Sequence, residues 1–183
     1  KNTVSDYRDI EIERQNSVYS SVLYSLYNNH KINIIDTPGF DDFVGEVISA
    51  LKVVDAAISV VSAQNGVEPG TETTWRQCDK VGKPVIFVIN HLEHDNSNFD
   101  ETVNQLRQSF SGGIAVCQYP INSGQGFNSI IDLLSMKMYK YPEGTGKAEI
   151  LDIPASEKDK AEELQAKLIE DLAANDESLM ESF

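Results

Sequence analysis

Four consecutive residues could take part in phosphate and magnesium chemistry, and they are Asp36, Thr37, Pro38 and Gly39. They follow an apolar run and precede apolar residues at helical spacing. An aspartate at the end of a buried strand can hold Mg²⁺, and a glycine lets its backbone N–H approach a phosphate. A turn between two elements explains the same four residues equally well, because proline and glycine favour turns.

A second candidate site begins at Asn90, which follows the apolar run 85–89. Nucleotide-binding sheets place residues that contact the base at the end of such a strand. His91 and Glu93 follow, and His94 lies three residues after His91. The two histidines could bind a metal, but no third ligand is indicated. We therefore interpret this stretch as a loop of solvated polar side chains.

Strands are predicted next to these candidate residues. Residues 18–27 and 31–35 are rich in β-branched and aromatic side chains around an Asn-Asn turn, which predicts a hairpin that ends at Asp36. The apolar runs 56–61 and 85–89 are short and nearly unbroken, as is typical of strands buried on both faces of a parallel sheet.

Helices alternate with these strands. Apolar residues at helical spacing predict helices over residues 44–54, 72–81 and 99–110, and residues 114–118 predict one more strand. The alternation of strand and helix predicts the α/β fold class, with a mainly parallel sheet flanked by crossover helices.

The chain changes character near Phe127, where we place a domain boundary between residues 1–127 and residues 128–183. The second part predicts short strands joined by a turn, and then a helix with a leucine every four residues. We interpret this leucine stripe as facing the core, with the charged side chains of the helix facing solvent.

Composition excludes several classes of protein. The chain has 183 residues with 15 Lys+Arg and 29 Asp+Glu, a formal net charge of −14, which argues against binding to free DNA or to an anionic membrane. No apolar run reaches the ~18 residues of a membrane span. Cys78 and Cys117 lie far apart in the sequence and form no metal-binding motif. We expect a monomeric cytoplasmic protein.

Several stretches resemble one protein family. Residues 32–43, Ile-Asn-Ile-Ile-Asp-Thr-Pro-Gly-Phe-Asp-Asp-Phe, resemble the switch II segment of the translational GTPases. Residues 66–77 and stretches between Ile130 and Met180 are similar to elongation factor G in particular. The resemblance implies a G-domain core of the P-loop NTPase type, followed by part of the small α+β G′ subdomain. It also implies GTP and Mg²⁺ as cofactors, the ribosome as partner, and GTP-driven translocation as the activity.

The resemblance also implies roles for individual residues. Asp36 and Ser17 match positions that hold Mg²⁺ when nucleotide is bound, and Phe40 stands where the family has the histidine that positions the attacking water. Three residues match other nucleotide-contacting positions: Thr37, Pro38 and Gly39. Three residues stand at the positions of the base-reading motif Asn-Lys-x-Asp: Asn90, His91 and Glu93.

The chain departs from the family pattern at several points. The phosphate-binding motif GxxxxGK[ST] is absent, so we expect an internal segment of a G domain that lacks its first strand and phosphate loop, with no GTP bound to this chain alone. His91 and Glu93 replace the Lys and Asp of the base-reading motif, and Ser17 replaces a threonine. Phe40 has no hydrogen-bonding group with which to hold water.

Two functions remain open on this evidence. The chain is part of a working elongation factor G-like GTPase, or it is part of a ribosome-binding paralogue whose GTP hydrolysis is weakened or lost. Residues 149–183 contain eleven acidic residues and three lysines. A solvated helix face is the plain interpretation of this charge, and the resemblance implies a contact between the acidic helix and the ribosomal stalk.

Overall fold

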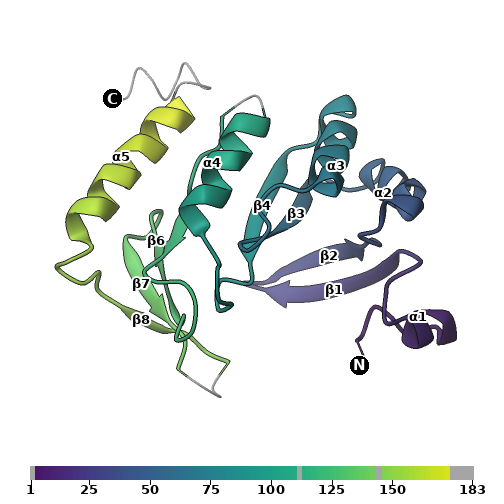
Figure 1. The fold of residues 1–183 in the computed structure, drawn as a ribbon, viewed down its shortest axis with the longest axis horizontal. Helices are drawn as coiled ribbons and strands as arrows, with labels where there is room; N and C mark the ends of the chain where they lie inside the picture. Colours follow the sequence, from purple (N-terminus) through teal and green to yellow (C-terminus); the bar gives the residue numbers. More distant parts are fainter. Residues whose placement is uncertain (1–2, 111–112, 143–145, 174–183) are drawn as a thin grey trace. The chain divides into compact units, whose positions relative to one another are not determined.

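The fold is drawn in Figure 1, from a computed structural model that describes residues 3–110, 113–142 and 146–173. The tail at residues 176–180, which carries part of the family resemblance, lies outside the described residues. Among the residues that the structure describes, no helix has the length and apolar character needed to cross a membrane.

The chain divides into two compact units. The first unit comprises Lys1–Ser59 and Glu68–Val88. The second unit comprises Val60–Val67 and Ile89–Phe183. The domain boundary expected near residue 127 remains a prediction.

The first unit begins with a helix that the sequence pattern did not predict, α1 (Asp9–Arg14). The helix ends at Arg14, and the next residue, Gln15, has a left-handed backbone with a φ of 56°. A left-handed residue after a helix reverses the chain, and glycine is the usual residue there. The chain therefore turns back after α1, and the backbone of Val18 and Tyr19 returns to contact the helix.

The predicted hairpin is confirmed. β1 (Ser21–Tyr27) and β2 (His30–Asp36) pair in antiparallel register along their whole length. Asn28 and Asn29 between them both have left-handed backbones, with φ of 45° and 62°. Two such residues form a tight turn whose twist matches that of the flanking strands. The hairpin thereby delivers Asp36 to the start of the Asp-Thr-Pro-Gly segment.

Three helical segments follow in the first unit. The 3₁₀ helix η1 (Asp41–Phe43) leads into α2 (Val44–Leu51). α3 (Pro69–Lys80) begins earlier than predicted, with Pro69 in its first turn, where the missing N–H of proline costs no helical hydrogen bond. α3 packs on the downstream strand, because the rings of Trp75 and Phe87 stack with centroids 6.0 Å apart.

β3 (Ala57–Ser62) and β4 (Val85–Asn90) form a two-stranded sheet, and hydrogen bonds near both ends show that the strands run parallel. The two strands were predicted, but the prediction that both faces are buried is wrong. The reason is that α3 contacts the face that carries Phe87, while the alternate residues point the other way. Those residues are 43–67% exposed: Ile58, Val60, Ile86 and Val88.

The second unit contains the predicted helix α4 (Phe99–Ser109), which Asn98 caps by accepting a 3.0 Å hydrogen bond from the Glu101 N–H. The prediction of a strand at residues 114–118 is wrong in its position. β5 (Gln118–Pro120) forms later, because these residues have a ladder partner in β6 (Ser129–Asp132).

Two more strands and a helix complete the second unit. β7 (Lys137–Lys140) and β8 (Glu149–Leu151) extend the sheet, giving the antiparallel order β5-β6-β7-β8. α5 (Lys158–Ala173) packs against it. Six buried residues form the shared core: Tyr119, Ile131, Leu133, Met138, Ala161 and Leu168. The leucine stripe is only partly core-facing, because Leu172 is 47% exposed near the end of the helix.

Candidate functional site

A cavity of about 420 Å³ lies in the first unit, between the loop after α1 and the Gly39–Phe40 segment. Six residues line it: Asp6, Gln15, Asn16, Ser17, Gly39 and Phe40. A smaller cavity of about 200 Å³ shares Asn16 and Phe40 with it. The structure therefore brings together three of the predicted site residues, Ser17, Gly39 and Phe40.

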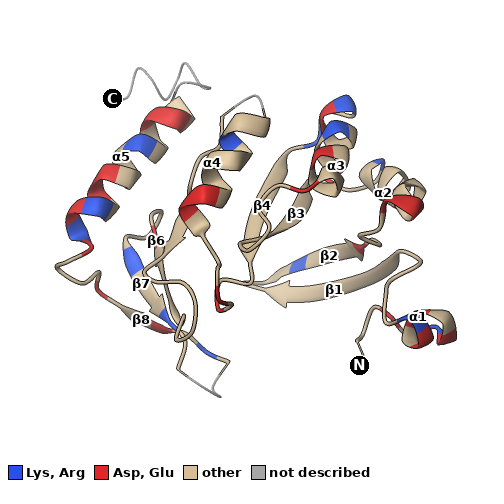
Figure 2. Ribbon diagram, in the orientation of Figure 1, with Lys and Arg blue, Asp and Glu red and all other residues tan. Residues whose placement is uncertain are grey.

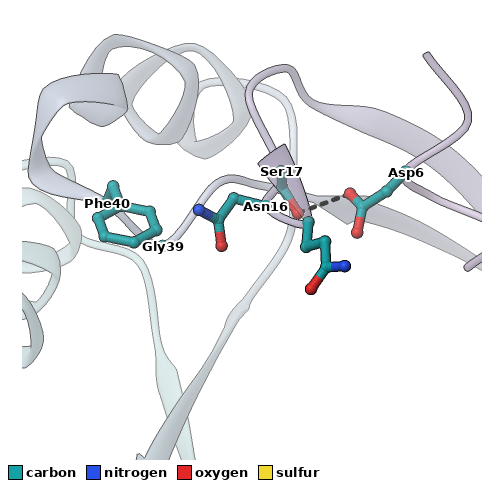
Figure 3. A pocket seen from close by; sticks show the side chains of 6 residues that line it. Asp6, Asn16, Ser17, Gly39 and Phe40 are labelled. Carbon is teal, nitrogen blue, oxygen red and sulfur yellow. Dashed lines mark hydrogen bonds between the residues drawn. The ribbon is translucent and has the colours of Figure 1, made fainter. Parts of the chain in front are cut away.

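Ser17 is held by Asp6, as Figure 3 shows. The Ser17 Oγ donates a hydrogen bond of 2.7 Å to Asp6 Oδ1. Thr3 Oγ1 donates to the other carboxylate oxygen, Oδ2, at 3.0 Å, and accepts from the Asp6 backbone N–H at 3.2 Å. Both oxygens of Asp6 thus accept from hydroxyl groups, and the Ser17 hydroxyl is directed at a carboxylate.

Glu11 holds the two residues that follow Ser17. Its side chain is buried, at 1% exposure, and its Oε1 accepts from the backbone N–H groups of Val18 and Tyr19, each at 3.1 Å. Oε2 accepts from the Arg8 N–H at 3.3 Å. The hydrogen bonds from Val18 and Tyr19 lower the pKa of the Glu11 carboxyl, and they outweigh the opposing effect of burial. Glu11 is therefore an ionised anchor for this loop.

Phe40 places a ring without hydrogen-bonding groups at the cavity wall (Figure 3). Its side chain is 57% exposed. Its backbone oxygen accepts from the Phe43 N–H at 2.9 Å, and this bond begins η1. The backbone at this position is therefore fixed, while the side chain contributes an apolar surface.

The rest of the Asp-Thr-Pro-Gly segment lies differently. Asp36 and Thr37 are half-buried and Pro38 is buried, and none of the three lines either cavity. A methyl group built on Gly39 would meet no atom within 4 Å. Open space therefore lies beside the Gly39 backbone, as a bound phosphate would require.

The other predicted site residues belong to the second unit. Asn90 is exposed at the end of β4, and His91 follows with a left-handed backbone of φ 62°. The His91 and His94 rings meet edge to face, 5.2 Å apart. Glu93 Oε1 lies 3.5 Å from His94 Nε2, and both side chains are about half exposed. Among the described residues, no group of three or more His, Cys, Asp or Glu could hold a metal ion.

Residues 1–174 match the family described as Elongation factor Tu GTP binding domain. The chain belongs to this family. Its structure matches the G-domain fold of a translational GTPase of the elongation factor G type, and the predicted family and fold class are confirmed.

A crystal structure of a protein from Thermus thermophilus is similar to this translational GTPase domain. The match has a TM-score of 0.90, with 28% sequence identity over 98% of this chain. The chain spans 27% of the length of that protein. Most of the longer protein therefore has no counterpart in this chain.

The family binds GTP, generally with Mg²⁺. The residues around the larger cavity fit the Mg²⁺ of such a nucleotide in their chemistry. The Ser17 hydroxyl and the Asp6 carboxylate are oxygen donors of the kind that Mg²⁺ prefers, and the space beside Gly39 is open. A nucleotide bound there would supply the phosphate bond on which hydrolysis would act.

Asp6, Glu11 and Gln15 were missed by reasoning from the sequence. One signal could have revealed Gln15. The translational GTPases have Arg-Gly-Ile-Thr where this chain has Arg14-Gln15-Asn16-Ser17, and glycine is favoured at a left-handed position such as this one. For Glu11, the signal is a glutamate at the third position of a helix, which commonly bonds back to the residue before the helix.

Proposed function

We propose that the chain is part of a factor that acts on the ribosome during translocation, with GTP as its nucleotide. The observation that carries the proposal is the family match over residues 1–174. The test uses the full-length protein that contains this chain, added with GTP to ribosomes that hold a peptidyl-tRNA before translocation. We expect the messenger RNA to move by one codon, measured by fluorescence of its labelled end. A protein that leaves the messenger RNA in place would contradict the proposal.

A second candidate function is a ribosome-binding paralogue with weak or absent hydrolysis. The observation that favours it is Phe40, whose ring lines the cavity where the family has a water-positioning histidine. The two candidates differ in one quantity, the ribosome-dependent release of phosphate. They share the expectation that the full-length protein sediments with ribosomes.

The proposed residue roles follow the family positions. Ser17 and Asp36 support Mg²⁺ when nucleotide is bound, and Phe40 occupies the catalytic position without supplying its chemistry. Three residues occupy other nucleotide-contacting positions of the family: Thr37, Pro38 and Gly39. Of these, Gly39 lines the larger cavity and Pro38 is buried. Three residues face the base: Asn90, His91 and Glu93. The exposure of Gly39 and Asn90 and the open space beside Gly39 support these roles.

The proposed protein partner is the ribosomal stalk, contacted by α5, with the factor acting as a monomer in the cytoplasm. Figure 2 shows that acidic and basic residues alternate along this helix, and Lys158 pairs with Glu162 at 3.9 Å. Glu163 and Glu170 are exposed. We expect the Glu163→Lys/Glu170→Lys variant of the full-length protein to sediment less with intact ribosomes. Equal sedimentation of variant and wild type would contradict this contact.

A further inference from the structure

Two acidic side chains near the start of the chain hold the loop that carries Ser17. We infer that Asp6 and Glu11 form a carboxylate clasp, which holds this loop against α1 and directs the Ser17 hydroxyl at Asp6. Both are positioning residues, because they act through Ser17 and its neighbours. The link from the clasp to nucleotide rests on the proposed function, whereas the clasp itself does not.

The first half of the clasp is the Asp6–Ser17 pair. The hydrogen bond of 2.7 Å joins residues eleven positions apart, so it closes the whole α1 segment into a loop. A hydroxyl that donates to a carboxylate makes a charge-assisted hydrogen bond, which is stronger than a neutral one. Any ligand that uses the Ser17 hydroxyl must therefore displace Asp6 or bind both groups together.

The second half is Glu11, and it acts on the backbone. Val18 and Tyr19 donate to one oxygen of a carboxylate that is 1% exposed. The left-handed turn at Gln15 brings these two N–H groups back to Glu11. Loss of the carboxylate would leave two backbone donors without their partner, which is costly in a buried site.

Three further contacts hold the same stretch. The Ser20 N–H donates to Glu46 Oε2 at 2.8 Å, and Ser21 Oγ donates to the Ser5 oxygen at 2.7 Å. The Arg8 guanidinium lies 4.0 Å from the centre of the Tyr19 ring. These contacts hold residues 19–21 where β1 begins, whereas the clasp contacts Ser17 and Val18 directly.

Hydrogen exchange of the full-length protein without nucleotide tests the clasp. The readout is the exchange rate of Val18 and Tyr19 in peptides that cover residues 15–21. We expect both amides to be protected in the wild type. Glu11→Ala should raise their exchange rate by at least about tenfold, because each amide loses a hydrogen bond to a charged group.

Two matched variants separate the clasp from a general weakening of the protein. Glu11→Gln keeps a carbonyl oxygen that can accept from Val18 and Tyr19, so it should restore much of the protection. Glu13→Ala changes an exposed glutamate of the same helix and should leave the loop unchanged. Peptides from β6 and β7 should exchange equally in all variants, which shows that the second unit remains folded.

Asp6→Ala, with Asp9→Ala as its control, tests the first half of the clasp. We expect Asp6→Ala to raise exchange over residues 15–21 less than Glu11→Ala does, and Asp9→Ala to have no effect, since Asp9 is exposed. The inference is overturned if the wild-type loop exchanges at the unprotected rate, or if Glu11→Ala and Glu13→Ala behave alike. These measurements contain no nucleotide or ribosome, so their failure is distinct from a failure in translocation.

Discussion

The two units of the molecule hold their segments in different ways. In the first unit, the Ser17 loop is fixed by hydrogen bonds to Asp6 and Glu11. In the second unit, the sheet and α5 enclose an apolar cluster in which Ile131 and Leu133 are fully buried. The strength of a hydrogen bond to a carboxylate depends on the ionisation of that group, whereas apolar burial does not. The difference means that the loop beside the cavity can open while the scaffold of the second unit stays folded.

The largest expected effect tests the apolar half of this comparison. Leu133→Ala removes a fully buried side chain from the core of the second unit, and it should lower the free energy of unfolding by about 2–5 kcal/mol. Leu134→Ala is the matched control, because Leu134 is 67% exposed and its loss should change stability little. Urea unfolding of both variants gives the values. Equal losses at the two positions would show that the core is wrongly placed.

A smaller effect is expected at the proposed base-reading loop of the second unit, residues 90–93, which is anchored by its backbone. The Gly124 N–H donates to the Leu92 oxygen at 2.7 Å, so the exposed side chains of His91 and Glu93 can be changed without disturbing the fold. The variant His91→Lys/Glu93→Asp restores the family motif. It should improve the preference of the full-length protein for GTP over ATP by about 1–3 kcal/mol. The reason is that the shorter aspartate side chain places its carboxylate at the distance from the guanine base that the family motif provides.

Competition between GTP and ATP measures this preference. His94→Lys is the control, because it adds the same charge one residue beyond Glu93. Wild-type protein that already prefers GTP by a thousandfold or more would contradict the interpretation of His91 and Glu93.

Low pH should weaken the hydrogen bonds of Glu11 in the first unit while leaving the apolar core of the second unit unchanged. The pKa of Glu11 is lowered by its hydrogen bonds from Val18 and Tyr19, so its contribution to stability is present above the ordinary glutamate pKa and is lost as pH falls through the lower folded value. The amide NMR signals of Val18 and Tyr19 should shift with a midpoint below the ordinary glutamate pKa. Glu11→Gln should abolish that shift. A midpoint at or above the ordinary value would contradict the clasp.

The smallest expected effect is a loss of stability of the second unit at alkaline pH, caused by the ionisation of Tyr119. Burial raises the pKa of Tyr119 to about 12, with a further contribution from Glu157, which accepts from the Tyr119 Oη at 3.3 Å. Because the folded pKa is raised, this contribution to stability is complete below the ordinary tyrosine pKa of about 10 and is lost as pH rises towards 12.

The difference in tyrosine absorbance between wild type and Tyr119→Phe isolates this group from the other tyrosines. Tyr119→Phe should also remove the alkaline loss of stability that Tyr119 causes. A tyrosine that titrates at its ordinary value in this difference would show that Tyr119 is not enclosed by the core.

The regular elements of the fold could be predicted because their signals are local. The Asn-Asn turn and its flanking β-branched residues define the hairpin, and the apolar runs define β3 and β4. α1 was missed because six residues are too short to show a helical repeat. The position of β5 was predicted wrongly because it depends on pairing with β6. The residues of β5 alone do not indicate that pairing.

The candidate site was predictable only in part, and for a related reason. Ser17, Gly39 and Phe40 stand in motifs, so the sequence identifies them, and the cavity brings them together. Asp6 and Glu11 contact the loop only because Gln15 reverses the chain after α1. Such a reversal at a residue other than glycine gives little local signal.

The central claim concerns Phe40, and ribosome-stimulated release of phosphate tests it most directly. The full-length wild type, Phe40→His and the control Phe43→His are compared at equal GTP and ribosome concentrations. A phenyl ring cannot orient water, and loss of a water-positioning group commonly costs about 10²–10⁴-fold in rate. We predict release near background for the wild type and for Phe43→His, which is the outcome expected of the second candidate function, with a rise for Phe40→His where the full-length protein has a phosphate loop. Robust turnover by the wild type would contradict this account of the site.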